Sequence, residues 1–237
     1  MGQLELTILI PALNEEKTIG RCIEKAKKFI EENNINGEIL VANNGSIDNI
    51  ANIANSLGAR VIDIEEKGYG ATLINGSKEA KGKYTIMGDA DDSYNFLEAM
   101  LILEKLREGY DFVIGNRYGG KMEKGAMPFS HKYFGTPFIS WLGRIKLKVK
   151  VTDFNCGLRG YDTEKMNNVD CKCTGMEYAS EMIIKAKKAN LKIAEVPINF
   201  YKDGRDRKPH LKTIQDGIRH LKLIMCNGYG EDCTKMN

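Results

Sequence analysis

The sequence has no run of about 18 consecutive apolar residues, and it therefore predicts no segment that crosses a membrane. Its six cysteines include no Cys-x-x-Cys pair, and no histidine lies near the close pair Cys171 and Cys173, which argues against structural zinc. The three histidines have no metal-ligand spacing, and the net charge of +3 is too small to indicate a nucleic acid partner. The first residues do not resemble a signal peptide, so we expect reduced thiols and a cytoplasmic location.

A regular alternation of apolar strands and amphipathic helices runs through residues 1–120. The 237-residue chain is 42% hydrophobic and 28% charged, which is ordinary for a soluble globular protein. Repeated strand–helix units predict an α/β fold, with helices flanking a mostly parallel sheet. The predicted strands cover residues 6–10, 38–42, 60–64, 84–87 and 111–115, and the predicted helices cover 18–32, 47–57, 70–80 and 95–106.

A short acidic stretch, Gly-Asp-Ala-Asp-Asp-Ser-Tyr at residues 88–94, follows the predicted strand 84–87. Asp89, Asp91 and Asp92 therefore lie at a strand end, where open α/β sheets bind ligands. Ionised carboxylates this close repel one another, and a Mg²⁺ or Mn²⁺ ion held together with phosphate oxygens relieves that repulsion. The stretch thus predicts a metal-bridged diphosphate. The alternative is a solvated acidic turn that caps the next helix, since Asp and Ser are favourable N-caps.

Polar residues also follow the other predicted strands, and parallel strands bring their carboxyl ends to one edge of a sheet. The polar segments that follow the strands together contain helix N-termini, glycines, carboxylates and cations. This combination suits a nucleotide diphosphate. Asn14 and Ser46 have an alternative role as caps or turn residues, and the Gly-Tyr-Gly at residues 68–70 lacks the rest of a P-loop. The segments are residues 11–16, 43–48, 66–70 and 116–118.

Several of these segments resemble, in their order and spacing, the successive signatures of family 2 glycosyltransferases with the GT-A fold. They are residues 10–16, 43–48 and 89–92. Three later segments resemble the polyprenyl-phosphate sugar transferases of the dolichol-phosphate mannose or glucose synthase type. They are residues 115–118, 152–159 and 175–182.

The resemblance extends over residues 4–225 and implies one GT-A domain over residues 1–237. Within this domain we expect a nucleotide-sugar-binding half at residues 1–120 and an acceptor- and membrane-facing half at residues 121–226. Residues 227–237 form a polar tail that we expect to be loose.

The resemblance also implies roles for residues of the donor site. Asp89 and Asp91 match the residues that bind Mg²⁺ or Mn²⁺ on the diphosphate, and Arg117 matches a cation near the phosphates. Asn43 stands where the family usually has an Asp that contacts the base, and Asn accepts a hydrogen bond without bringing a charge. Ser93 stands where a metal-binding Gln is often found. The predicted nucleotide-binding residues are Pro11, Leu13, Glu15, Asn43, Gly70, Asp89, Ala90 and Asp91.

Residues 122–151 interrupt the strand–helix alternation and mix aromatic and aliphatic side chains with lysines and arginines. This mixture is typical of an interfacial membrane segment, in which apolar side chains enter the acyl boundary and cations bind lipid phosphate. Together with the resemblance, it predicts peripheral attachment to the cytoplasmic face of a membrane. The alternatives are a packing segment under the sheet edge or a half-buried strand, because residues 145–151 alternate strictly.

The last third of the chain adds a basic loop and two helices. Residues 201–210 carry four cations and a glycine, and we expect Arg205 and Arg207 to clamp the acceptor phosphate. A predicted helix at residues 176–188 places Glu177 and Glu181 one turn apart, either as a functional pair or as an exposed acidic edge facing Lys185. We further predict a turn at 161–162 and an edge strand at 193–200. An amphipathic helix is predicted at 211–225, and its apolar face consists of Leu211, Ile214, Ile218, Leu221 and Met225.

The function implied is transfer of a hexose from UDP-glucose or GDP-mannose to a polyprenyl phosphate such as dolichyl phosphate. The acceptor phosphate is ionised at neutral pH, so no general base is required, and a single displacement inverts the anomeric centre. One alternative is transfer to a sugar hydroxyl in glycan or polysaccharide assembly, which needs a base, and Glu177 is then the first candidate. A second alternative, left open by Asn43 and Ser93, is a sugar-nucleotide-binding module without activity.

Overall fold

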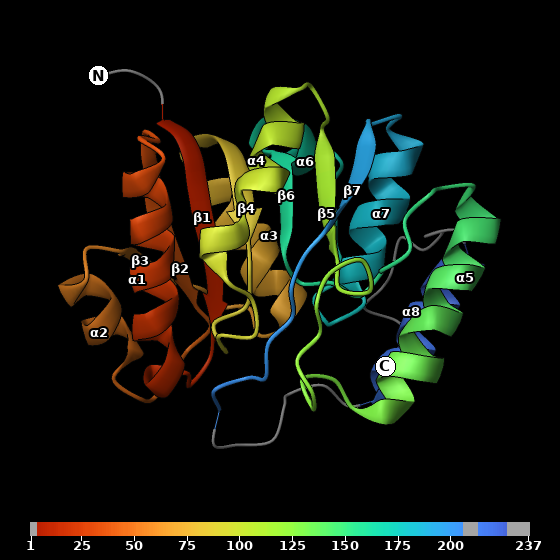
Figure 1. Cartoon of the computed structure of the whole chain (residues 1–237), viewed down its shortest axis with the longest axis horizontal. Coiled ribbons are helices and arrows are strands. Elements are labelled where there is room, and N and C mark those ends of the chain that lie inside the picture. Colours follow the sequence, from red (N-terminus) through yellow and green to blue (C-terminus); the bar gives the residue numbers. More distant parts are fainter. Residues whose placement is uncertain (1–3, 206–212, 227–237) are drawn as a thin grey trace.

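A seven-stranded sheet forms the centre of the computed structural model, which describes residues 4–205 and 213–226 (Figure 1). The strand order is β3-β2-β1-β4-β6-β5-β7. The strands are β1 (Leu4–Ala12), β2 (Gly37–Asn43), β3 (Arg60–Asp63), β4 (Gly82–Met87), β5 (Phe112–Asn116), β6 (Arg159–Asp162) and β7 (Ile193–Pro197).

Most neighbouring strands are parallel, as the strand–helix alternation predicts. The parallel pairs are β1 with β2, β1 with β4, β2 with β3 and β5 with β7. β6 runs antiparallel to both β4 and β5. The parallel strands therefore end at one edge of the sheet, and the polar segments of the sequence meet there.

Helices cover both faces of the sheet. α1 and α4 lie on one face, and α3, α6 and α7 lie on the other (Figure 1). α5 and α8 pack against each other beyond the β7 end of the sheet. The helices are α1 (Glu16–Glu32), α2 (Ile50–Ser56), α3 (Tyr69–Glu79), α4 (Met100–Arg107), α5 (Thr136–Leu147), α6 (Thr163–Asn167), α7 (Tyr178–Lys188) and α8 (Thr213–Met225), with a 3₁₀ turn η1 (Phe96–Glu98) and a π-helical turn η2 (His131–Gly135).

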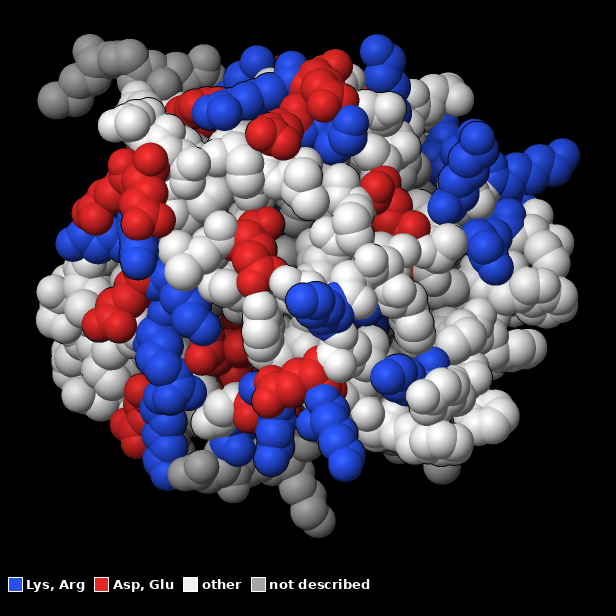
Figure 2. All heavy atoms as spheres, in the orientation of Figure 1, with Lys and Arg blue, Asp and Glu red and all other residues white. Residues whose placement is uncertain are grey.

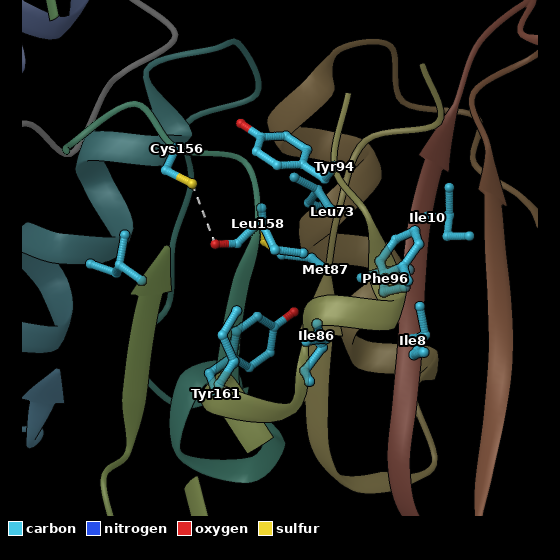
Figure 3. Close-up of a cluster of buried hydrophobic side chains, with 14 of the residues drawn as sticks. Ile8, Ile10, Leu73, Ile86, Met87, Tyr94, Phe96, Cys156, Leu158 and Tyr161 are labelled. Atoms are coloured by element: carbon cyan, nitrogen blue, oxygen red, sulfur yellow. Dashed lines mark hydrogen bonds between the residues drawn. The ribbon is translucent and has the colours of Figure 1, made fainter. Parts of the chain in front are cut away.

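The core lies between the sheet and these helices. Ile8 and Ile10 of β1, Ile86 of β4 and the ring of Phe96 are completely buried and form part of one apolar cluster (Figure 3). Burial of such side chains contributes about 1.5–3 kcal/mol each. The cluster stabilises the strands whose carboxyl ends build the site.

Two predictions near β4 are wrong. The predicted helix 95–106 is divided, because the Asn95 side chain accepts a hydrogen bond from the Leu97 N–H and caps η1 before α4 begins. The predicted turn at Tyr161 and Asp162 is instead β6, in which Tyr161 pairs with Thr85 of β4 and is fully buried. At Gly160 a Cβ atom would lie 2.3 Å from Ile102 Cγ2, so glycine lets this strand pass beneath α4.

The strand suggested by the alternation at residues 145–151 is also wrong. Ile145 belongs to the last turn of α5, which ends where Lys148 adopts a left-handed conformation with φ 52°. The apolar face predicted for α8 is wrong at Ile218 and Met225, which are exposed, whereas Leu223 and Ile224 are buried. Leu211 of that predicted face lies outside the described residues. The edge position predicted for β7 is confirmed.

The cysteines agree only in part with the expectation of reduced thiols. Cys22, Cys156, Cys171 and Cys226 are free. Cys173 is disulfide-bonded, which corrects the expectation for this residue. In the part of the chain that the structure describes, no helix has the length and apolar character needed to cross a membrane.

Candidate functional site

A cavity of about 1210 Å³ lies at the carboxyl edge of the sheet. Its walls come from segments that follow β1, β2, β4 and β5, and from the loops before α7 and after β7. The predicted site residues that line it are Pro11, Leu13, Glu15, Asp89, Ala90, Asp91, Arg117 and Arg205. Strand ends far apart in sequence thus meet in one cavity.

Asp89 lies deep in this cavity, at the end of the segment that leaves β4. The Tyr69 hydroxyl donates a hydrogen bond of 2.9 Å to Asp89 Oδ1. A Cβ atom at position 157 would lie 2.6 Å from Asp89 Oδ2, so Gly157 leaves the carboxylate its space. Burial, and then repulsion by Asp91, raise the pKa of Asp89 to about 6. A cation near both carboxylates would favour the ionised form.

Asp91 and Asp92 point in different directions. Asp91 Oδ1 accepts from the Ser93 N–H (3.0 Å), and Asp91 Oδ2 lies 2.9 Å from Arg205 Nη2. Asp92 instead pairs with Arg21 (3.1 Å) and Lys25 (2.6 Å) of α1. The acidic stretch therefore offers two carboxylates to the cavity and uses the third to hold α1.

The pair Asp89 and Asp91 suits a hard divalent cation. Mg²⁺ and Mn²⁺ bind carboxylate oxygens, and Mg²⁺ usually takes one or two carboxylates together with waters and substrate phosphates. Within residues 4–205 and 213–226, no group of three or more His, Cys, Asp or Glu side chains is arranged to hold a metal ion. The donor set fits an ion that is shared with a diphosphate rather than one enclosed by protein.

Arg205 supplies the positive charge that now faces these carboxylates. Its guanidinium contacts Asp91, Asp203 (3.3 Å) and, at 3.8 Å, Glu15. The loop that carries it is fixed by the Gly204 N–H, which donates to the Asp91 carbonyl (2.9 Å). Arg205 therefore lies directly over the predicted metal ligands. Arg207, the second predicted clamp residue, lies outside the described residues.

Arg117 is held by a partner that the sequence did not reveal. Asp153 accepts hydrogen bonds from Arg117 Nε (2.7 Å) and Nη2 (2.8 Å), and both side chains are buried. The guanidinium also stacks over Phe200, with 5.1 Å between the carbon and the ring centroid. Arg117 itself lines the cavity, and its Nη1 takes no part in the hydrogen bonds to Asp153.

Two predicted nucleotide-binding residues do not line the cavity. Asn43 donates to Asp63 (2.7 Å) and accepts from the Ser46 N–H (3.0 Å), so its amide is occupied at both ends. The Gly70 N–H donates to the Thr174 carbonyl (2.9 Å), and this glycine permits close approach of the loop before α7. Their neighbours Asn44, Lys67 and Gly68 line the cavity instead.

Arg159 organises the loop beside the cavity from within the protein. It is completely buried, and it donates to the carbonyls of Phe154 (2.7 Å), Cys156 (2.7 Å) and Ala179 (2.6 Å). These bonds tie the 152–157 loop to α7. Arg159 lies in the segment 152–159, which was singled out in the sequence by its resemblance to a family. Nothing in the sequence of that segment indicated that the charge of Arg159 is buried.

Glu177 and Glu181 are both buried, so the predicted exposed acidic edge is wrong. Glu181 accepts from the backbone N–H groups of Lys172 and Cys173, and burial raises the pKa of its carboxyl. Glu177 Oε2 is buried and has no hydrogen-bond partner in the described part of the chain. Glu177 lies behind Gly175, which lines the cavity, and does not line it itself.

A row of exposed apolar side chains, here called the aromatic face, runs along η2 and α5. It consists of Phe134 (65% exposed), Phe138 (52%), Trp141 (50%) and Ile145 (58%). The other side of α5 packs inward, where Gly143 fits against the Phe154 ring. Figure 2 shows lysine and arginine but no acidic side chains along the edge of the molecule formed by α5.

Comparison with known sequences points to one family. The model described as "Glycosyl transferase family 2" matches residues 7–169. The chain is 36% identical over 226 residues to the low-salt glycan biosynthesis hexosyltransferase Agl6 of Haloferax volcanii, with coverage of 95% of this chain and 54% of that protein. It is 28% identical over 233 residues to the dolichol-phosphate mannosyltransferase of Pyrococcus furiosus, with coverage of 94% and 64%. The chain thus spans about half the length of the first relative and under two thirds of the second.

Solved structures share the fold. Glucosyl-3-phosphoglycerate synthase from Mycobacterium tuberculosis, in complex with Mn²⁺, UDP and phosphoglyceric acid, matches 97% of this chain and 80% of its own. The TM-score is 0.75 and the sequence identity 19%. The predicted GT-A type of α/β fold is therefore confirmed.

Proposed function

Because the chain belongs to glycosyl transferase family 2, we propose that it transfers a hexose from UDP-glucose or GDP-mannose to a polyprenyl phosphate such as dolichyl phosphate. The names of the relatives from Haloferax volcanii and Pyrococcus furiosus support this reaction. The observation that carries the proposal is the meeting of Asp89, Asp91 and Arg205 in one cavity at the sheet edge. Such a pairing of carboxylates with a guanidinium suits a diphosphate and its cation.

The donor diphosphate is assigned to the end of the cavity at Asp89 and Asp91. These residues would hold Mg²⁺ or Mn²⁺, and the bound cation supplies positive charge against the leaving nucleotide. The occurrence of Mn²⁺ and UDP together in the mycobacterial synthase of the same fold supports this assignment. The nucleoside is then assigned to Pro11, Leu13 and Glu15, at the carboxyl end of β1 and in the segment that follows it.

The two arginines are assigned to the phosphates in different ways. Arg117 is fixed by Asp153 and presents Nη1, so it gives a preorganised donor. Arg205 is paired with Asp91, and phosphate oxygens offer it alternative acceptors. We assign Arg205, with Arg207, to the acceptor phosphate beside the anomeric carbon.

No general base is needed for this reaction. The acceptor phosphate is already ionised, so the chain's tasks are to align it with the anomeric carbon and to stabilise charge on the leaving group. Attack from the face opposite the nucleotide inverts the anomeric centre. The cavity's fixed groups, held by Tyr69 and Asp153, serve this alignment.

The second half of the chain is assigned to the acceptor, with residues 1–120 as the donor half and 121–226 as the acceptor half. The aromatic face lies on this second half and is flanked by Arg144, Lys146 and Lys148, all exposed. Aromatic side chains next to cations favour the surface of an anionic membrane. We propose that α5 rests on the cytoplasmic face of the membrane and brings the lipid phosphate to the cavity.

A second candidate is transfer to a sugar hydroxyl. Glu177 favours it, because one of its oxygens is buried without a hydrogen-bond partner among the described residues. A carboxylate in that state is a candidate general base once a substrate approaches. Its position behind Gly175, outside the cavity wall, makes the phosphate acceptor the better supported reading.

A phase-partition assay separates these functions. Radiolabelled UDP-glucose and GDP-mannose are each incubated with the protein, Mg²⁺ or Mn²⁺, and either a short polyprenyl phosphate or an oligosaccharide. The proposal predicts metal-dependent label in the organic phase with one donor, retained by Glu177→Gln. Label only in the oligosaccharide, abolished by Glu177→Gln, would support the hydroxyl acceptor. Nucleotide binding without product from either acceptor would support a binding module.

A further inference from the structure

The side chain of Glu195 accepts four hydrogen bonds, although the sequence indicated no role for this residue beyond its place in the predicted strand 193–200. Its Oε1 accepts from the backbone N–H groups of Thr152 (2.7 Å) and Asp153 (2.9 Å). Its Oε2 accepts from the Thr152 hydroxyl (2.6 Å) and from Asn116 Nδ2 (3.2 Å). Glu195 therefore joins the edge strand β7 to two separate loops.

These two loops carry the buried ion pair of Arg117 and Asp153. On one side, Asn116 Oδ1 accepts from the N–H groups of Tyr118 (2.8 Å) and Gly119 (3.1 Å), so the amide that donates to Glu195 also shapes the turn around Arg117. On the other side, Glu195 binds the backbone of Asp153 itself. Asp153 is thus bound to Glu195 through its own backbone N–H, and Arg117 is bound to it through the side chain of the preceding residue, Asn116.

The four groups that reach Glu195 are all hydrogen-bond donors. A carboxylate accepts at both oxygens, whereas the amide of glutamine would turn an NH₂ group toward donors at one end. The ladder between β5 and β7, with Ile114 opposite Glu195, is made by the backbone and does not need this side chain. The carboxylate of Glu195 therefore serves the loops rather than the sheet.

We propose that Glu195 is a positioning residue for transfer, which fixes the loops at 116–119 and 152–153 so that Arg117 presents Nη1 to the phosphates. This inference rests on the function proposed above. Glu195 does not line the cavity, so it acts through Arg117 and not on the substrate. Small displacements of such a group are costly, because a misplacement of about 1 Å reduces a rate by about a hundredfold.

A double-mutant cycle tests the proposal. Glu195→Gln is expected to lower kcat/KM for label transfer about tenfold in the otherwise unchanged protein. Arg117→Lys loses the planar fork that Asp153 holds. In the Arg117→Lys background, Glu195→Gln is expected to change kcat/KM by less than about twofold, because residues that act through one another are not additive. A residue with a merely structural role would show the same fold-loss in both backgrounds.

Glu38, on β2 near the opposite edge of the sheet, provides a matched control. Its carboxylate also accepts several hydrogen bonds, from Thr7, Arg60 and the Lys81 N–H. Glu38→Gln is expected to lower the melting temperature yet to leave kcat/KM within about twofold in both backgrounds. If Glu195→Gln does not fold, Thr152→Val takes its place in the cycle: it removes the bonds of the hydroxyl to Glu195 and to Asn116 Nδ2 (2.8 Å) and leaves the backbone N–H bonds to Glu195.

The outcomes separate this inference from the proposed function. Transfer by the unchanged protein, with additive losses in the cycle, would overturn the role of Glu195 alone. Absence of transfer with either donor and either acceptor would overturn the proposed function and the role of Glu195 with it. A loss caused by Glu195→Gln in the otherwise unchanged protein, but not in the Arg117→Lys background, would support both.

Discussion

At the scale of single residues, Arg205 occupies the place where a cation is expected. Its guanidinium lies 2.9 Å from Asp91 and 3.8 Å from Glu15, in a cavity that also contains Asp89. A guanidinium so placed compensates the repulsion between the carboxylates. It must leave Asp91 if a divalent cation is to bind there.

Arg205→Ala is therefore expected to have opposite effects on two ligands. Mn²⁺ binding to the nucleotide-free protein becomes tighter, by about tenfold, because Asp91 no longer has a competing partner. Binding of the polyprenyl phosphate acceptor becomes weaker by a similar factor, because a hydrogen-bond donor to its phosphate is lost. Electron paramagnetic resonance measures Mn²⁺ binding, and the KM for the polyprenyl phosphate in the transfer assay measures the second effect. Weaker Mn²⁺ binding by the variant would contradict the counter-ion role.

His220 gives a pH-dependent contribution to stability. It is buried between Ser180 and Asn155, and burial, followed by the charge of Arg159, lowers its pKa from 6.5 to about 4. Below pH 6.5 the imidazole of His220 becomes protonated in the unfolded chain, whereas in the folded protein it stays neutral until the pH falls to about 4. Stability from this residue is thus present above pH 6.5 and lost as the pH falls, by about 1.4 kcal/mol per pH unit.

His220→Gln should remove this dependence. The difference in unfolding free energy between the unchanged protein and the variant is expected to shrink by about 2–3 kcal/mol between pH 7 and pH 4.5. Urea unfolding at a series of pH values measures it. A difference that stays constant over this range would show that the imidazole is protonated in the folded protein as easily as in the unfolded chain.

At the scale of elements, α5 has two dissimilar faces. Ile139 and Gly143 pack inward against the protein, and the aromatic face points outward. The sequence predicted the mixture of apolar and basic residues but left a strand and a packing segment open. In the structure this segment is a helix, and the helical period places Phe134, Phe138 and Trp141 together on one side.

Membrane attachment through this face predicts a specific loss. The double substitution Phe138→Ser and Trp141→Ser is expected to lower binding to vesicles with anionic lipid at least about tenfold, because it removes two half-exposed rings. Cosedimentation with vesicles measures the bound fraction. Leu101→Ser on α4, which removes another half-exposed apolar side chain far from α5 in sequence, is the control and should bind normally. Equal binding by all three proteins would contradict attachment through α5.

The sequence predicts those elements that are stabilised by local periodic patterns and misses those that are stabilised by pairing with distant strands. β1, α1 and β2 follow local periodicity, so they were predicted within a few residues. β6 was missed because four residues with a charged residue at each end and a glycine carry no strand pattern, and only pairing with β4 and β5 makes Tyr161 a core residue. Tertiary contacts, not propensity, determine such an element.

The same distinction applies to the site. Asp89, Asp91 and Arg117 were predicted to meet because they follow strands whose carboxyl ends share one edge of the sheet, and each lines the cavity. The partners that hold them, Tyr69 and Asp153, come from loops whose geometry no pattern in the sequence records. The occupied amide of Asn43, facing Asp63, is likewise visible only once β2 and β3 are paired.

At the scale of the whole molecule, one edge of the sheet joins the two halves of the chain. β4 brings the acidic pair, β5 brings Arg117, and the loop after β7 brings Arg205 back over both. α5 and α8 extend the structure beside this edge, where a lipid acceptor would approach (Figure 1). The central claim is that the acidic pair at this edge carries metal-dependent transfer to a lipid phosphate.

The most direct test compares two neighbouring carboxylates in the phase-partition assay. Asp91→Asn removes a carboxylate that faces the cavity, whereas Asp92→Asn removes one that pairs with Arg21 and Lys25 outside it. We predict metal-dependent label in the lipid phase for the unchanged protein, a loss of at least about a hundredfold for Asp91→Asn, and a change of less than about threefold for Asp92→Asn. Undiminished transfer by a folded Asp91→Asn protein would contradict the account.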